Sequence, residues 1–285
     1  MDSRNDKRLT TKPRRAGSPL LRRAFHLAFH LALMCGLFVQ GCTAQTAQEG
    51  NKNAPPQPQA TPTQQSVQQG DDIVVTPIMH ASLQIEFGGK VIHVDPTRAG
   101  DYTKAKQADL ILVTDIHGDH LDPAAIARIR KPGATVVAPA AAAPKIENAT
   151  VLANNESRSV AGFGLEAIPM YNLKRGPSEG QLFHTKGRGN GYVLTLGGKR
   201  VYFAGDTECT PEMRALKNID IAFIPMNLPY TMPPSEAAEC VRAFKPKVVY
   251  PYHYRGQKPE EFKTALAAEP IEVRLLEWYP KGSDK

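Results

Sequence analysis

The sequence predicts an α/β fold in which two β-sheets pack face to face and helices cover their outer surfaces. Short runs rich in Val, Ile, Leu and Phe, separated by Gly, Pro or Asp, recur along residues 71–285 and are typical of strands. Gly88-Gly89 and Gly197-Gly198 each separate two such runs, which predicts two hairpins. Because hairpins followed by strand–helix units occur twice, the pattern favours a sandwich of two sheets.

In the first half, four strands are expected before the first helix. Asp122 as an N-cap and Pro123 at the first helical position predict a helix over 122–131. A further strand is expected over 134–140, with a short helix over 140–146. The four preceding strands are expected over 72–78, 82–89, 90–96 and 108–115.

The second half repeats this order. Helices are expected over 210–218 and over 233–244, where Pro and Ser open the segment. The strands are expected over 162–170, 190–198, 199–206, 219–226, 247–254 and 271–279.

The first 41 residues have the order of an export signal. Arginines precede an apolar run over 24–39 that contains two histidines and is shorter than the ~20 apolar residues of a membrane span. The box Val39-Gln40-Gly41-Cys42 is typical of bacterial lipoproteins, which predicts Cys42 as the lipidated first residue of the mature protein. The alternatives are a plain cleaved signal and an uncleaved anchor. Residues 42–70, rich in Gln, Pro, Ala and Thr, are expected to form a disordered tether to a domain over 71–285.

Charge gives no support to a nucleic-acid partner. The whole chain carries a net charge of +7, but residues 1–41 hold eight basic and two acidic residues, which accounts for +6 of it. The remainder is nearly neutral, so the basic excess belongs to the leader. Beyond Cys42, the remaining cysteines are Cys209 and Cys240, for which buried or free thiols are expected rather than a disulfide.

Chemistry is concentrated in the stretch "TDIHGDHLD", where Asp115, His117, Asp119 and His120 follow an expected strand. Imidazole nitrogens and carboxylate oxygens at a strand end suit a divalent metal that activates water. The alternative is a solvated loop that happens to be rich in His and Asp. Two later stretches strengthen the metal interpretation: "YFAGDTE" places Asp206 after a strand, and "YPYHY" places His253 at the end of another.

Together with "MHASLQIEFGGKVIHVDP", these motifs resemble the metallo-β-lactamase-fold hydrolases, in the branch of ascorbate-6-phosphate lactonase-like and N-acylphosphatidylethanolamine phospholipase D-like proteins. The resemblance covers residues 73–279 and implies a four-layer αββα sandwich. It also implies that one metal is held by Asp119, His120, Asp206 and His253. A second metal would use His117 and Asp206, with Asp115 standing where the family carries a histidine.

The family's third histidine is expected after the strand 162–170, where this chain has Asn172. His184, twelve residues later, is the tentative replacement, as a metal ligand or a substrate contact. His80 and Tyr254 are expected beside the ligands or the substrate, and Asp95 is expected to support the ligand loop by hydrogen bonding. Tyr252, Arg255 and the segment 226–234 are candidates for the pocket wall or for core packing. His93, inside a strand pattern, is expected to be structural.

The function expected from this set is metal-dependent hydrolysis of an ester, lactone, amide or phosphodiester, with Asp119 orienting the water or accepting its proton. One or two divalent ions are expected, zinc first and manganese or iron as alternatives. The expected substrate is a small or lipid-derived molecule, and the expected location is the bacterial cell envelope, on a membrane through the lipid anchor. The alternative is a binding protein on the same scaffold that has lost catalysis through Asp115 and the missing third histidine. An iron oxidoreductase is a third interpretation.

Overall fold

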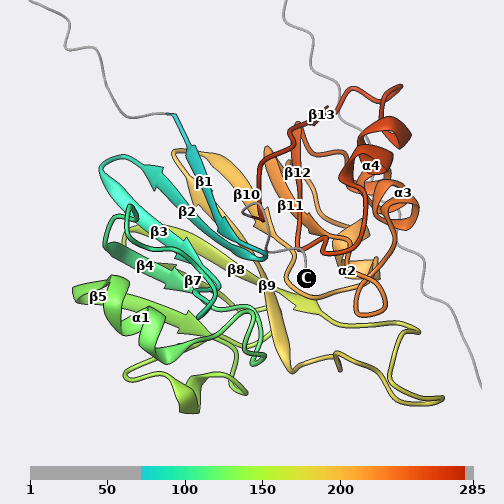
Figure 1. The fold of residues 1–285 in the computed structure, drawn as a ribbon. Helices are drawn as coiled ribbons and strands as arrows, with labels where there is room; N and C mark the ends of the chain where they lie inside the picture. The colour runs from blue at the N-terminus through green and yellow to red at the C-terminus, as the bar shows by residue number, and fades with distance from the viewer. Residues whose placement is uncertain (1–71, 280–285) are drawn as a thin grey trace, which may run out of the picture. The chain divides into compact units, whose positions relative to one another are not determined.

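The computed structural model describes residues 72–279, and these form two β-sheets with helices around them (Figure 1). The predicted signal peptide, the lipidation site Cys42 and the tether 42–70 lie outside the described residues. Within the described residues, no helix has both the length and the apolar character that a membrane crossing requires.

The first sheet has the spatial order β1 to β6, and its strands change from antiparallel to parallel. The strands β1, β2 and β3 pair antiparallel, and β3, β4, β5 and β6 pair parallel. Gly88 and Gly89, both with positive φ, form the tight turn predicted between β2 and β3. The six strands are β1 (Val74–Met79), β2 (Ser82–Phe87), β3 (Lys90–Val94), β4 (Ala108–Leu112), β5 (Arg130–Ala138) and β6 (Thr150–Val151).

The second sheet repeats this arrangement. The strands β7 to β10 pair antiparallel, with the predicted hairpin at Gly197-Gly198, and β10 to β13 pair parallel. Because both sheets end in parallel strands, several carboxyl ends of strands open onto one edge of the sandwich. The seven strands are β7 (Ser157–Val160), β8 (Phe163–Met170), β9 (Gly189–Leu196), β10 (Lys199–Phe203), β11 (Ile221–Pro225), β12 (Val248–Tyr252) and β13 (Glu272–Val273).

Strand alternation divides the core into three apolar layers. Leu110 and Leu112 of β4 face the layer between the two sheets, whereas Ile111 and Val113 face the helix α1 (Pro123–Ile129). On the other side, α2 (Pro211–Arg214), α3 (Pro234–Phe244) and α4 (Pro259–Ala265) cover the second sheet. The order helix, sheet, sheet, helix confirms the predicted four-layer αββα sandwich.

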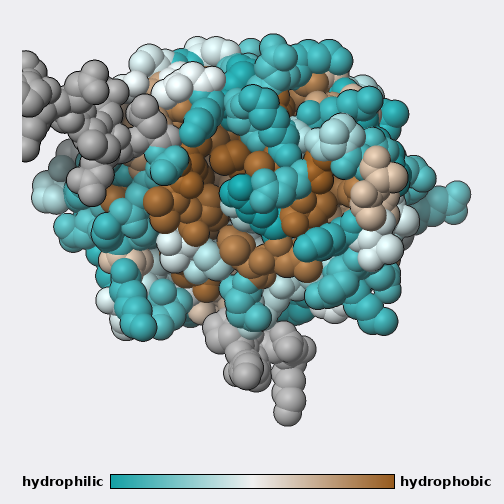
Figure 2. Space-filling view, turned by 90° about the horizontal axis from the view of Figure 1, so that it is seen from above, coloured by the Kyte–Doolittle hydropathy of each residue, from teal (hydrophilic) through white to brown (hydrophobic). Residues whose placement is uncertain are grey.

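Hydrophobic residues reach the surface on one face of the molecule (Figure 2). Seen from above, hydrophobic residues form a band near the middle of the molecule, with hydrophilic residues around it (Figure 2). Partly buried hydrophobic residues pack against the inter-sheet cluster, among them Ile73, Val75, Phe87 and Phe163.

Several predicted element boundaries are wrong. The predicted strand 271–279 is a strand only at Glu272–Val273. Apolar residues after it pack into the core: Trp278 is fully buried, with its ring edge-on to those of Phe223 and Tyr252. The predicted helix over 140–146 is a single 3₁₀ turn at Ala143–Lys145. The strands β6 and β7 and the helix α4 were not predicted.

Candidate metal centre

The stretch after β4 turns sharply into α1. The His117 carbonyl accepts hydrogen bonds from the backbone N–H groups of His120 and Leu121, at 3.1 and 2.9 Å, so the chain turns immediately past His117. Asp122 then caps α1 by accepting from the Ala125 N–H at 2.8 Å, as predicted. The turn aims Asp119 and His120 toward the edge where β10 and β12 end.

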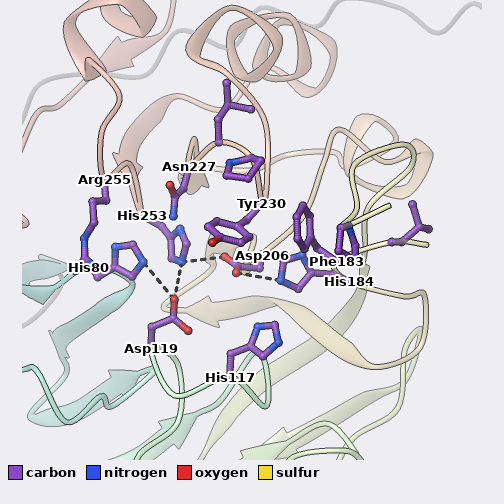
Figure 3. Close-up of a pocket in the computed structure, with 14 residues that line it drawn as sticks. His80, His117, Asp119, Phe183, His184, Asp206, Asn227, Tyr230, His253 and Arg255 are labelled. Atoms are coloured by element: carbon purple, nitrogen blue, oxygen red, sulfur yellow. Dashed lines mark ion pairs between the residues drawn. The ribbon is translucent and has the colours of Figure 1, made fainter. Parts of the chain in front are cut away.

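Asp119, His120, Asp206 and His253 converge at this edge, with their ligand atoms all within 4.8 Å of one another. His253 Nε2 lies 3.1 Å from Asp206 Oδ1 and 3.5 Å from Asp119 Oδ2, and His120 Nε2 lies 3.3 Å from Asp206 Oδ2. Figure 3 shows Asp119, Asp206 and His253 facing one another across the pocket. The structure therefore brings together the residues for which the sequence predicts one complete ligand set.

The donor atoms of this group fit a divalent cation. His120 Nε2, Asp206 Oδ1 and both ring nitrogens of His253 are buried without a hydrogen-bond partner. Buried polar atoms are normally paired, so unpaired ligand atoms that meet at one point fit a divalent cation. The neighbouring carboxylates also favour positive charge at this point. Burial disfavours a charged imidazole, yet Asp206 and Asp95 outweigh it and raise the pKa of His120 well above its usual value.

A second group, formed by Asp115, His117 and His184, also has its ligand atoms within 4.8 Å of one another. His184 Nε2 lies 3.2 Å from Asp206 Oδ2, so Asp206 lies between the two groups (Figure 3). Asn172 holds His184 by accepting from its backbone N–H at 2.9 Å and by pairing with its ring Nδ1 at 2.6 Å. His184 is thus part of the site, and Asn172 orients it.

Asp115 has a partner that the sequence analysis missed. Arg188 donates to both of its carboxylate oxygens, at 3.1 Å from Nε and 2.8 Å from Nη2. Burial alone would raise the pKa of Asp115, but the hydrogen bond from His117 and the charges of His120 and Arg188 outweigh it and lower this pKa to about 2. The Asp115 carboxylate is therefore ionised and already paired.

Asp95 contacts the ligand loop through three hydrogen bonds. Its carboxylate accepts from the Thr114 N–H and hydroxyl, both at 2.7 Å, and pairs with His120 Nδ1 at 2.8 Å. These contacts correspond to the supporting role expected of Asp95. A partner on Nδ1 directs the other ring nitrogen of His120 toward the ligand cluster.

His80 lies beside Asp119, with its Nε2 3.4 Å from Asp119 Oδ2 and its Nδ1 2.6 Å from the Tyr279 hydroxyl. Burial, and then the neighbouring His253, lower the pKa of His80 to about 4, although the hydrogen bond with Asp119 opposes them. His80, Asp95 and His253 all have positive φ, between 48° and 58°. Non-glycine residues in this region are uncommon and cluster at functional sites.

A pocket of about 770 Å³ opens onto these side chains, a size in the range of small-molecule sites. The segment 226–234 and Arg255 do supply wall residues, but Tyr252 and Tyr254 do not line this pocket: the Tyr254 ring packs against Tyr279, 5.1 Å between centroids. The lining residues are His80, His117, Asp119, Pro177, Leu182, Phe183, His184, Asp206, Asn227, Leu228, Pro229, Tyr230, His253 and Arg255 (Figure 3).

The loop that carries much of this wall, residues 171–188, is held by a buried carboxylate. Glu208 accepts from the backbone N–H groups of Leu173, Lys174 and Arg175 and from the Arg175 guanidinium, at 2.8–3.1 Å. Sequence reasoning missed Glu208 as a loop anchor. Glu208 lies two residues after Asp206, but this position indicates a loop anchor only when the loop 171–188 is known to fold back over β10.

The prediction that Cys209 and Cys240 are buried or free thiols is wrong. Cys209 and Cys240 form a disulfide that links the loop after Asp206 to α3. Their sequence separation of 31 residues gave no indication of this proximity, which arises because α3 packs beside α2. His93, by contrast, is structural as predicted: it is buried, and its Nε2 bonds the Lys106 carbonyl at 2.9 Å.

The αββα sandwich and the His/Asp cluster at its edge define a metal-dependent hydrolase of the metallo-β-lactamase superfamily, and comparison with known proteins agrees. The β-lactamase superfamily domain matches residues 74–253. A UPF0173 metal-dependent hydrolase of Thermococcus kodakarensis is 35% identical over 217 residues, which cover 70% of this chain and 93% of that protein. The chain belongs to this UPF0173 family of metal-dependent hydrolases.

Solved structures support the assignment. A crystal structure described as a metal-dependent hydrolase, from Parabacteroides distasonis, is 44% identical with a TM-score of 0.68, covering 72% of this chain and 93% of that one. Igni18, a metallo hydrolase from Ignicoccus hospitalis, is 25% identical with a TM-score of 0.59 and covers 72% and 94%. The predicted hydrolase class is therefore confirmed.

Proposed function

We propose that this enzyme hydrolyses a small ester, lactone or phosphodiester. It would use a divalent cation held by Asp119, His120, Asp206 and His253, with zinc as the first candidate. The observation that carries the proposal is the convergence of these four side chains beside an open pocket, with unpaired buried atoms on His120, Asp206 and His253. When bound, a divalent cation supplies a Lewis acid for the electrophile and a nucleophilic water at neutral pH.

The protein's own groups supply proton transfer and positioning. Asp119 is the most accessible member of the set, with 46% of its side chain exposed, so it can reach both the cluster and a molecule in the pocket. Burial disfavours its charge, but the neighbouring imidazoles of His253 and His80 outweigh this and hold the pKa of Asp119 well below its usual value. An ionised carboxylate in this place can accept the proton of the attacking water.

The pocket wall favours a substrate with an apolar arm. Phe183 and Tyr230 pack edge to face, 5.0 Å between ring centroids, and Leu182, Leu228 and Pro229 also line the pocket. Leu228 and Tyr230 are 38% and 45% exposed, so both offer apolar surface to a bound molecule. An acyl or aromatic group bound there would remain next to the cluster.

Hydrolysis is tested with purified, zinc-loaded protein on p-nitrophenyl esters from acetyl to octanoyl, on lactones and on bis-p-nitrophenyl phosphate. Asp119→Asn is expected to lower kcat/KM by at least about 100-fold, the usual contribution of a proton-transfer group. The matched control is Asp109→Asn, at the opposite end of β4, which should leave kcat/KM unchanged. Bound metal without turnover of any substrate would instead support a binding protein.

The apolar arm is tested with the same esters. If Phe183 and Tyr230 hold the acyl chain, KM should fall about threefold to fourfold for each added CH₂ that is buried. Phe183→Ala should raise KM for the octanoyl ester and leave the acetyl ester nearly unchanged. Equal effects on both esters would contradict this part of the proposal.

The location that we propose is the bacterial cell envelope, with the protein anchored to a membrane through Cys42. The leader pattern supports this location, and so does the Cys209–Cys240 disulfide, because disulfides persist mainly in oxidising compartments. Cys42→Ala should move the protein from the membrane fraction to the soluble fraction of cells. Unchanged membrane association would contradict lipidation at Cys42.

A further inference from the structure

The Asp115 carboxylate is fully buried and is occupied by a side chain of the protein itself. Arg188 donates from Nε and Nη2 to the two carboxylate oxygens, and its remaining nitrogen, Nη1, donates to the Phe183 carbonyl at 2.9 Å. All three nitrogens of the guanidinium are therefore used. Such a bidentate arginine–carboxylate pair is among the strongest and most directional of protein hydrogen-bond arrangements.

The backbone places Arg188 at this position. The next residue, Gly189, begins β9 and packs so closely that an added Cβ would lie 2.9 Å from the Thr114 carbonyl. The Asn190 N–H donates to that same carbonyl at 2.9 Å. Because this segment lies directly against Thr114, the Arg188 side chain has only a short distance to reach Asp115.

The pair bears on how many metal ions the site can hold. A guanidinium stays charged in proteins, so Arg188 places a permanent positive charge beside the Asp115 carboxylate, the only carboxylate in the group of Asp115, His117 and His184. A dication in that group would have to share Asp115 with this charge and would be repelled by it. Among the contacts of the Asp119, His120, Asp206 and His253 group, by contrast, no lysine or arginine is found within the described residues.

We infer that Arg188 takes the place of one cation of a two-metal centre, so that this enzyme holds a single divalent ion, in the group of Asp119, His120, Asp206 and His253. The inference rests on the proposed function and states the metal content of its site. His117 and His184, which both line the pocket, are then left to contact the substrate. Arg188 is a positioning residue, because it acts through Asp115 and through the wall residue Phe183.

Metal content tests the inference without reference to activity. The purified protein is loaded with zinc, desalted and analysed by plasma mass spectrometry. We expect one ion per chain, no ion in His120→Ala, and still one ion in His117→Ala, whose half-exposed ring is easily removed. Two ions per chain in the unmodified protein, or loss of an ion in His117→Ala, would overturn the inference.

Removing the guanidinium tests the role of Arg188 itself. Arg188→Met removes the guanidinium and its charge and keeps a shorter, unbranched apolar side chain, and we expect the variant to bind two ions per chain. The double variant Asp115→His with Arg188→Met avoids an unpaired buried carboxylate and should also bind two. Arg200→Met is the matched control, since Arg200 pairs with Glu166 on the second sheet, and it should bind one. One ion in both Arg188 variants, with native circular dichroism, would overturn the role of Arg188.

Manganese gives an independent readout. The manganese-loaded protein should show the electron paramagnetic resonance signal of an isolated Mn²⁺ ion, and Arg188→Met should show a spin-coupled pair. A coupled pair in the unmodified protein would overturn the inference while leaving the hydrolase proposal intact. Protein that binds no ion at all would overturn both.

Discussion

Asp95 shows how a residue outside the ligand set can control a ligand. Its φ of 48° is a conformation in which asparagine and aspartate are enriched among non-glycine residues. From there its carboxylate reaches Thr114 and the Nδ1 of His120, and it fixes both the orientation and the tautomer of the imidazole. The geometry of the metal site thus depends on a side chain that does not itself face the cluster.

Asp95→Asn should therefore weaken metal binding while keeping the fold. Asparagine tolerates the positive φ, but its amide cannot accept every hydrogen bond that the carboxylate accepts. We expect zinc affinity to fall about 10- to 100-fold, the usual effect of removing an outer partner of a ligand histidine. Competition with a chromophoric chelator measures it, and Asp109→Asn is the control. Unchanged zinc affinity in Asp95→Asn would show that the Thr114 hydroxyl, 3.1 Å from His120 Nδ1, is enough to orient His120.

Sequence could predict the residues of the main cluster because each lies at a recognisable strand end. The resemblance to metallo-β-lactamase-fold hydrolases implied the set Asp119, His120, Asp206 and His253, and parallel strands bring such strand ends to one edge. Arg188 could not be chosen in this way. A carboxylate in a histidine's place requires a cation nearby, but Lys174, Arg175, Lys186 and Arg188 all lie in the same loop. Only the packing of β9 against Thr114 selects among them.

At the scale of the element, local patterns predicted the hairpins and the long strands, and tertiary contacts decided the rest. Glycine pairs and alternating apolar residues are local signals, so β2, β3, β9 and β10 could be predicted. The strand β7 has mostly exposed residues, and β6 has only two residues, so neither shows an alternating apolar pattern. Pairing with β8 and with β5 makes them strands.

The disulfide joins two such elements, the loop that follows Asp206 and the helix α3. It closes a loop of 31 residues, for which the chain-entropy model gives a stabilisation of about 3–4 kcal/mol. The double variant Cys209→Ala with Cys240→Ala should lower the free energy of unfolding by about this amount, measured by urea denaturation. Dithiothreitol should destabilise the natural protein and leave the double variant unaffected. Equal unfolding curves for both proteins without dithiothreitol would contradict a stabilising disulfide.

At the scale of the whole molecule, the cluster joins the two sheets. Asp119 and His120 follow β4 of the first sheet, whereas Asp206 and His253 follow β10 and β12 of the second. The apolar layer between the sheets already holds them together. A bound ion would add a polar link at the edge where the pocket opens, so metal binding and global stability should be coupled.

Removal of the metal should therefore lower the melting temperature. At a free zinc concentration of 100 times Kd, binding stabilises the native state by about 2.7 kcal/mol. For a domain of this size, that corresponds to a shift in Tm of about 5–10 °C, measured by differential scanning calorimetry with and without a chelator. His120→Ala, which lacks a ligand, should melt at the same temperature in both conditions. If the chelator lowers the Tm of His120→Ala as much as that of the natural protein, the stabilising ion lies elsewhere.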